Sequence, residues 1–171
     1  MTTYVALLRA VNVGGTGKLP MTALKALCAE LGFVRVQTYI ASGNVVFDST
    51  LAAVEIESRL ENRLLDYAGK AVGVLVRTAE EMNRVLDGNP FVDKEANHTY
   101  AFFLPGKPGA DALHDIRGQA DEEVRVGSQE IYVYYPSGMG QSKLRIPLAR
   151  LGTARNLNTV ARLVALSSRN R

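Results

Sequence analysis

The residues best suited to chemistry in this chain lie in short polar segments rich in glycine, amide, hydroxyl and cationic side chains. The first segment runs from Asn12 to Lys18 and contains Gly14, Gly15 and Gly17. A glycine-rich turn between a strand and a helix exposes backbone N–H groups that bind phosphate or carboxylate oxygens. Such a turn can also serve chain geometry alone. Two interpretations therefore stay open, a plain turn and an anion site.

The same segment departs from the known nucleotide-binding motifs. A phosphate-binding loop with a terminal Gly-Lys pair needs a glycine where this chain has Asn12, and a Ser or Thr where it has Leu19. The glycine fingerprint of dinucleotide-binding folds is absent as well. Any anion bound here would be recognised in a way that these motifs do not describe.

Serine catalysis and metal binding are not expected. Ser42 lacks the flanking glycines of a nucleophile elbow. The two histidines, His98 and His114, and the single Cys28 do not have the close spacing that a structural zinc site requires. Cys28 falls on the apolar side of a predicted helix, where a buried, unreactive thiol is the simpler interpretation. We expect no metal and no cofactor.

Further polar segments follow along the chain. Ser42-Gly43-Asn44 interrupts a β-rich stretch, which predicts a bulge or tight bend that directs Ser42 and Asn44 toward a cleft. A second glycine-rich segment begins at Ser137 and ends on Ser142 and Lys143.

The last polar segment lies near the end of the chain. Arg155, Thr159 and Arg162 follow helical spacing opposite an apolar stripe, with Thr153 or Asn156 as the cap. An arginine at a helix start meets positive partial charge, so Arg155 should either pair with a carboxylate of the protein or bind an anionic ligand.

Composition describes one globular chain of 171 residues with a net charge of +3. Collagen-like, coiled-coil and disordered classes do not fit. The charge is unevenly distributed, because residues 1–130 carry 13 basic and 17 acidic side chains and residues 131–171 carry 7 basic and none acidic. No apolar run approaches the length of a membrane span, and nothing resembles a signal peptide. We expect a cytoplasmic protein that does not contact a membrane.

The elements that position these segments alternate between strands and helices. Strands are predicted near 4–8, 33–47, 71–77, 99–104, 123–126 and 130–135, and helices near 20–31, 51–67, 78–88 and 110–119. Gly32 is expected to end the first helix in a left-handed conformation, and Thr78 and Glu81 to form a capping box. The strands near 123–126 and 130–135 flank Gly127-Ser128-Gln129, which predicts a β-hairpin. Residues 71–77 and the helix after them weakly echo residues 4–8 and their helix. An α+β fold of two subdomains is expected, with residues 1–70 and part of the tail in one, residues 71–140 in the other, and a basic helical tail over 141–171.

Four of these segments resemble a known family. Leu8 to Gly15, Leu31-Gly32-Phe33, Ser42 to Phe47 and Thr153 to Val160 together resemble the bacterial domain-of-unknown-function-1697 family. The family often has tryptophan where this chain has Leu157. The resemblance implies two ferredoxin-like α/β subdomains packed together, and it implies no activity.

We therefore expect the polar groups to meet in one cleft that binds a small phosphorylated or nucleotide-like anion. The alternatives are a nucleic-acid-binding module acting through the basic tail, an enzyme acting on a phosphorylated substrate, and motifs that only hold the subdomains together. The oligomeric state is left open. The expected ligand-binding residues are Arg9, Asn12, Gly14, Gly15, Lys18, Ser42, Asn44, Ser142, Lys143, Arg155, Asn156, Asn158 and Thr159.

Overall fold

The protein is seen here as a computed structural model that describes residues 1–11 and 18–169. The chain divides into two compact units. The first unit holds Met1–Asn83 and the end of the chain from Arg162, and the second unit holds Arg84–Ala161. Asn12, Gly14 and Gly15 lie outside the described residues.

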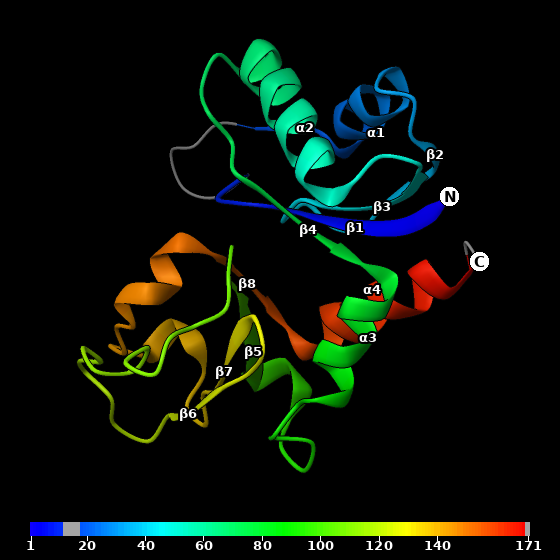
Figure 1. Ribbon diagram of the computed structural model, residues 1–171. Coiled ribbons are helices and arrows are strands. Elements are labelled where there is room, and N and C mark those ends of the chain that lie inside the picture. The colour runs from blue at the N-terminus through cyan, green and yellow to red at the C-terminus, as the bar shows by residue number, and fades with distance from the viewer. Residues whose placement is uncertain (12–17, 170–171) are drawn as a thin grey trace. The chain divides into compact units, whose positions relative to one another are not determined.

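The first unit is a ferredoxin-like plait. Its strand order, β2-β3-β1-β4, has every neighbouring pair antiparallel, and α1 and α2 cover one face of the sheet (Figure 1). This order arises because the chain forms two strand–helix–strand units, and the hairpin of β2 and β3 joins them. The elements in chain order are β1 (Thr2–Leu8), α1 (Met21–Glu30), β2 (Val34–Thr38), β3 (Asn44–Ser49), α2 (Ala53–Ala68) and β4 (Val74–Thr78).

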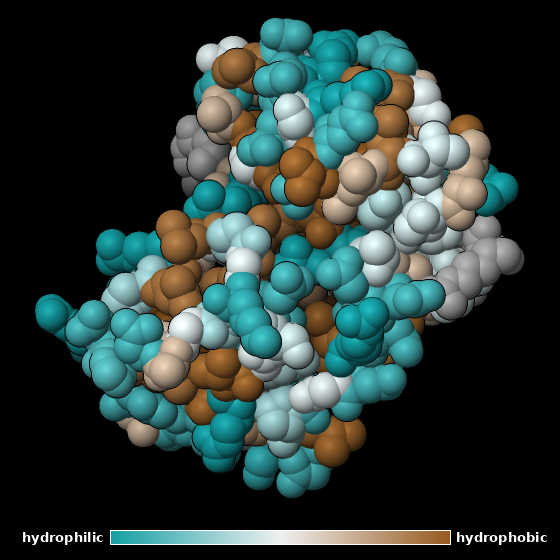
Figure 2. Space-filling model, viewed as in Figure 1, coloured by the Kyte–Doolittle hydropathy of each residue, from teal (hydrophilic) through white to brown (hydrophobic). Residues whose placement is uncertain are grey.

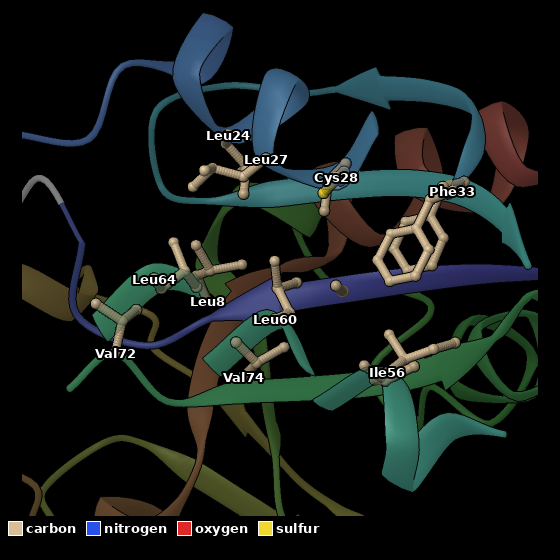
Figure 3. Close-up of a cluster of buried hydrophobic side chains, with 14 of the residues drawn as sticks. Leu8, Leu24, Leu27, Cys28, Phe33, Ile56, Leu60, Leu64, Val72 and Val74 are labelled. Atoms are coloured by element: carbon tan, nitrogen blue, oxygen red, sulfur yellow. The ribbon is translucent and has the colours of Figure 1, made fainter. Parts of the chain in front are cut away.

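The core of the first unit lies between this sheet and its two helices. In Figure 3, Leu24 and Cys28 from α1 and Leu60 from α2 extend toward the sheet beneath them, and all three are fully buried. Phe33 stacks on Phe47 of β3 with ring centroids 4.3 Å apart. Burial raises the pKa of the Cys28 thiol to about 12, so this cysteine stays protonated and unreactive.

Helix α1 ends where the sequence predicts. Gly32 adopts a left-handed conformation with φ of +88°. The Gly32 N–H donates to the Ala29 carbonyl, and the Phe33 N–H donates to the Cys28 carbonyl. These two bonds form a Schellman motif, which satisfies carbonyls at the end of the helix and turns Phe33 back into the core.

Strand β4 lies at an edge of the sheet, and glutamates cover its outer backbone. Glu57 accepts a hydrogen bond from the Val76 N–H at 3.0 Å. Glu81, at the start of α3 (Ala79–Asp87), accepts one from the Thr78 N–H at 2.9 Å. The Thr78 hydroxyl accepts the Glu81 N–H at 3.1 Å, which confirms the capping box expected from the sequence. These carboxylates protect the edge from pairing with another chain.

Glu61 completes this cover and provides a test of it. Burial raises the pKa of its carboxyl and the neighbouring Glu57 raises it further, while the hydrogen bond from Val74 and the charge of Arg9 lower it. Because the folded state holds this proton more tightly than the unfolded chain, the contribution of Glu61 to stability falls as pH rises through its titration range. Glu61→Gln keeps the acceptor oxygen and removes the charge.

We expect Glu61→Gln to match or exceed the wild type in thermal stability at pH 7, by no more than about 0.5 kcal/mol. The difference should shrink as pH falls toward 4, where the wild-type carboxyl becomes protonated. Thermal unfolding followed by circular dichroism at both pH values measures this. A lower melting temperature for the variant at pH 7 would contradict the account.

The second unit repeats the strand order of the plait with different connections. Its sheet has the order β6-β7-β5-β8, again antiparallel throughout. Turns and short 3-10 segments replace the α-helices that cross the sheet in the first unit. The elements are η1 (Ala96–His98), β5 (Thr99–Phe103), β6 (Glu123–Val126), β7 (Glu130–Tyr134), η2 (Met139–Gln141), η3 (Pro147–Leu151) and β8 (Thr153–Asn156). The expectation of two ferredoxin-like subdomains is confirmed at the level of two four-stranded antiparallel sheets with helical segments.

The helix expected near residues 110–119 is wrong. Two successive turns stand there, closed by the Ala112 N–H to the Gly109 carbonyl and the His114 N–H to the Asp111 carbonyl. From this segment, Leu113 and Ile116 pack on the core of the unit. So short a segment gains too little burial to offset the free energy of starting a helix.

The expectation of a helical tail over 141–171 is correct only in its second half. Helix α4 (Leu157–Arg169) begins after β8, and the Asn156 side chain caps it by accepting the Thr159 N–H at 2.9 Å. Arg155 belongs to β8 and pairs with Ala101 of β5, so it does not share a helix face with Arg162. Helical spacing misled here because a strand formed by pairing with a distant segment overrides the local pattern.

The division between the units also differs from the expected one at residue 70. Strand β4 belongs to the first sheet, beside β1. The sequence echo between residues 4–8 and 71–77 therefore relates two neighbouring strands of one sheet, not two halves of the chain.

Figure 2 shows much of the visible surface as hydrophilic, with smaller hydrophobic patches. Isolated exposed apolar side chains such as Val54 are normal on such a surface.

Candidate functional site

The first unit contains a cavity of about 460 Å³ at one end of its sheet. It opens where β1 ends, where the chain enters α1, and where α2 ends and leads toward β4. In the plait these ends lie at the same edge, so segments far apart in sequence share one cavity. The lining residues are Arg9, Ala10, Val11, Lys18, Leu19, Leu64, Tyr67, Ala68, Lys70, Ala71 and Val72.

The walls of this cavity are apolar and its charged groups are all cationic. Leu19, Leu64 and Val72 are buried. Arg9, Lys18 and Lys70 provide the charge, and no Asp, Glu or His occurs among the described residues that line the cavity. Tyr67 adds an aromatic ring that is 48% exposed. The cavity therefore combines a positive potential with an apolar and aromatic surface, and its volume lies in the range of small-molecule sites.

The backbone holds Arg9 at this cavity. The Arg9 N–H donates to the Gly73 carbonyl at 2.9 Å, and a Cβ atom on Gly73 would lie 2.9 Å from Arg9 Cδ. Glycine at position 73 thus allows the arginine stem to pack directly on the backbone before β4. The next residue, Ala10, has φ of +53°, a left-handed conformation that costs a non-glycine residue about 1–2 kcal/mol. Strain of this kind clusters at functional sites.

Of the expected ligand-binding residues, Arg9 and Lys18 line this cavity. Ser42 and Asn44 instead build the connection between β2 and β3. The Asn44 amide donates to the Tyr39 carbonyl at 2.8 Å and to Ser42 Oγ at 2.9 Å, and Asn44 is fully buried. These contacts give Ser42 and Asn44 a structural role in the first unit, and a role in ligand binding stays a prediction.

The group around Arg155 lies in the second unit. Arg155 is buried, and its guanidinium donates to Thr153 Oγ1 at 2.7 Å and to the Ala154 carbonyl at 2.8 Å. Burial lowers the pKa of Arg155 to about 10. Asn156 and Thr159 form the cap of α4, and Asn158 is exposed. We expected this group to lie in one cleft with Arg9 and Lys18. Because the two groups belong to different units, that expectation stays a prediction.

Ser142 lines a second, smaller cavity within the second unit. Its hydroxyl donates to Glu122 and accepts the Leu144 N–H at 3.1 Å. Lys143 follows it and is exposed. The hydrogen bond from Ser142, supported by one from the Ala120 N–H, holds the pKa of the Glu122 carboxyl below its ordinary value. Ser142 thus lies at a cavity different from that of Arg9, and Lys143 is not among the described residues that line either cavity.

Sequence reasoning did not identify Tyr67 and Lys70 as candidate site residues. Neither belongs to a recognisable motif, and both line the cavity because α2 ends there. Gly69 ends that helix in a left-handed conformation with φ of +71°, and its N–H donates to the Leu65 carbonyl. A glycine and a lysine directly after an amphipathic helix are common signs of a helix end, so they carried no signal for a site.

No helix among the described residues has the length and apolar character needed to cross a bilayer. Within the same residues, no three His, Cys, Asp or Glu side chains are grouped as metal ligands would be.

Comparison with known proteins identifies relatives by sequence and by fold. Residues 1–132 match the family model described as protein of unknown function, DUF1697. The fold is similar to the structure of conserved bacterial protein SP0830 from Streptococcus pneumoniae, with a TM-score of 0.80 and 23% sequence identity over 97% of this chain and 98% of that one. No curated protein matches the chain.

Proposed function

Because the chain belongs to the DUF1697 family, whose description assigns no function, we propose from the geometry that it is a binding protein for a small phosphorylated or nucleotide-like anion. The observation that carries this proposal is the cavity of the first unit. Its described lining combines apolar side chains with three cations and contains no carboxylate. Cationic side chains that line a cavity raise its electrostatic potential and favour the binding of an anion.

Each part of the cavity has a role in this proposal. Arg9 offers a planar guanidinium that binds two oxygens of a phosphate at once, while Lys18 and Lys70 act as point charges. Tyr67 and the buried Leu19 and Val72 offer a surface for an apolar or aromatic part of the ligand. The end of α2 carries negative partial charge, which Lys70 also offsets.

The alternative functions have less support. An enzyme acting on a phosphorylated substrate needs a general acid or base, and the described lining of the cavity contains no carboxylate or imidazole. A nucleic-acid-binding tail is weakened because Arg155, one of its cations, is buried in the second unit. Both alternatives stay predictions.

Calorimetry and thermal unfolding of the full chain with pyrophosphate, AMP and ATP test the proposal. A bound ligand at 100 times its Kd stabilises the folded state by about 2.7 kcal/mol, which raises the melting temperature of a protein of this size by about 5–10 °C. We expect the nucleotides to bind and the affinity to fall as ionic strength rises, because part of the binding is electrostatic.

Variants locate the binding. Arg9→Gln and Lys70→Gln should each weaken AMP about tenfold or more, the loss typical of one charge-assisted hydrogen bond. The matched control is Lys25→Gln, which removes an exposed charge from α1 outside the cavity and should leave the affinity unchanged. Equal affinity in wild type and in the Arg9→Gln, Lys70→Gln double variant would refute the site.

A further inference from the structure

The cavity of the second unit has features of a separate binding site. It encloses about 240 Å³ beside β5 and the segment that contains η2 and η3. Its walls include Phe102 and the buried Tyr135, Leu144 and Ile146. This volume is smaller than the cavities that hold drug-sized molecules, and the walls suit a compact apolar group.

Cationic side chains gather at this cavity. Arg145 and Arg150 line it. Arg145 also forms an antiparallel bridge with Arg117, since each backbone N–H donates to the other residue's carbonyl, at 2.7 and 3.0 Å. Residues bridged in this way have Cα atoms about 5.5 Å apart and side chains on the same side. Two like charges directly opposite each other destabilise the pairing, and an anion between them removes that penalty.

The close approach that brings the two arginines together depends on a glycine. Gly118, directly after Arg117, has φ of +71°, and a Cβ atom there would lie 2.2 Å from the Lys143 carbonyl oxygen. Only glycine permits this backbone contact without movement of the chain. The arginine pair is therefore part of the built geometry of the unit.

Hydroxyl groups complete the lining. Ser142 donates to the buried Glu122, and the Ala120 N–H donates to the same carboxylate at 2.6 Å. Burial raises the pKa of the Tyr135 hydroxyl to about 12, with Glu122 acting in the same direction and Arg145 against it. Tyr135 thus keeps its proton at neutral pH and can donate it to an acceptor.

We propose that the second unit binds a small carboxylate with a compact aromatic or branched aliphatic body. The carboxylate lies against the guanidinium of Arg145, with Arg117 and Arg150 beside it, and the apolar body fills the space between Phe102, Leu144 and Ile146. Arginine and carboxylate form paired, charge-assisted hydrogen bonds in this geometry. The site is independent of the anion cavity in the first unit and does not rest on the function proposed there.

The probes are benzoate, benzamide and acetate, titrated into the full chain by calorimetry or ligand-observed NMR. Benzoate has both the charge and the apolar body, benzamide lacks the charge, and acetate lacks most of the apolar body. We expect benzoate to bind at least about tenfold more tightly than either analogue, because each analogue loses one of the two contributions. Equal binding of benzoate and benzamide would overturn the proposal.

Variants place the binding within the molecule. Arg145→Gln should weaken benzoate about tenfold or more, and Arg117→Gln should weaken it in the same direction. Lys107→Gln removes an exposed charge of the same unit that does not line the cavity, and it should leave benzoate affinity unchanged. Lys18→Gln, in the first unit, should also have no effect on benzoate. If Arg145→Gln binds benzoate as tightly as Lys107→Gln does, the proposed site is wrong.

Discussion

Replacing Gly43 by alanine should destabilise the protein by about 2–5 kcal/mol, because two separate penalties add at this position. Gly43 has φ of +90°, a conformation that costs alanine about 1–2 kcal/mol. Its Cβ atom would also lie 2.7 Å from Val11 Cγ2 and 2.8 Å from Leu8 Cβ. Overpacking of this kind in a rigid core typically costs about 1–3 kcal/mol. Urea unfolding of the full chain measures the sum.

Gly32→Ala is the matched control for Gly43→Ala. Gly32 has nearly the same φ, +88°, but a Cβ atom there meets no described residue within 4 Å. It should lose only the conformational part, about 1–2 kcal/mol. Equal losses for the two variants would show that the contact with Leu8 and Val11 is not important. Since Val11 also lines the cavity of the first unit, Gly43→Ala should weaken AMP binding there, whereas Gly32→Ala should not.

Gly152→Ala should have the largest effect in the second unit, a loss of about 3 kcal/mol or more. A Cβ atom on Gly152 would lie 1.8 Å from the Phe103 carbonyl oxygen and 2.8 Å from its carbonyl carbon. These atoms belong to the backbone of β5, which cannot move aside as a flexible side chain would. Thr153 pairs with Phe103 at the start of β8, so the alanine must push β8 away from β5 and break the edge of the sheet.

Gly106→Ala provides the comparison for Gly152→Ala in the same unit. A Cβ atom on Gly106 meets nothing within 4 Å in the part of the chain that the structure describes, and its backbone needs no left-handed conformation. Alanine there should leave stability unchanged or raise it by about 0.4–1 kcal/mol, because it restricts the unfolded chain. Urea unfolding and hydrogen exchange of the β5 and β8 amides follow both variants. Native protection of β8 in Gly152→Ala would refute the prediction.

Gly43 lies in a segment that carries the family resemblance, and Gly152 lies next to another. Gly43 stands in Ser42-Gly43-Asn44, and Gly152 precedes the segment from Thr153 to Val160. In the structure, the first segment packs a turn onto β1 and the second forms β8 and the cap of α4. The polar side chains in these segments therefore serve local structure in ways that a list of residue types cannot distinguish from ligand binding.

The candidate site was only partly predictable for a related reason. Arg9 and Lys18 were expected from their place around a glycine-rich segment, and both line the cavity of the first unit. Tyr67 and Lys70 come from the far end of α2, and only the return of the chain into β4 brings them beside Arg9. Ser142 was assigned to the same cleft, but it lines a cavity in the other unit.

The sequence by itself determined the elements whose stability is local. The apolar spacing of α1 and α2, the left-handed Gly32, the capping box of Thr78 and Glu81, and the hairpin of β6 and β7 all depend on neighbours within a few residues, and all were predicted. Only the tertiary structure decided that β4 joins the first sheet, that Arg155 lies in a strand, and which cations share a cavity. The free energy that favours these arrangements comes from pairing and packing between distant segments, and the spacing of residues along a short segment does not reveal it.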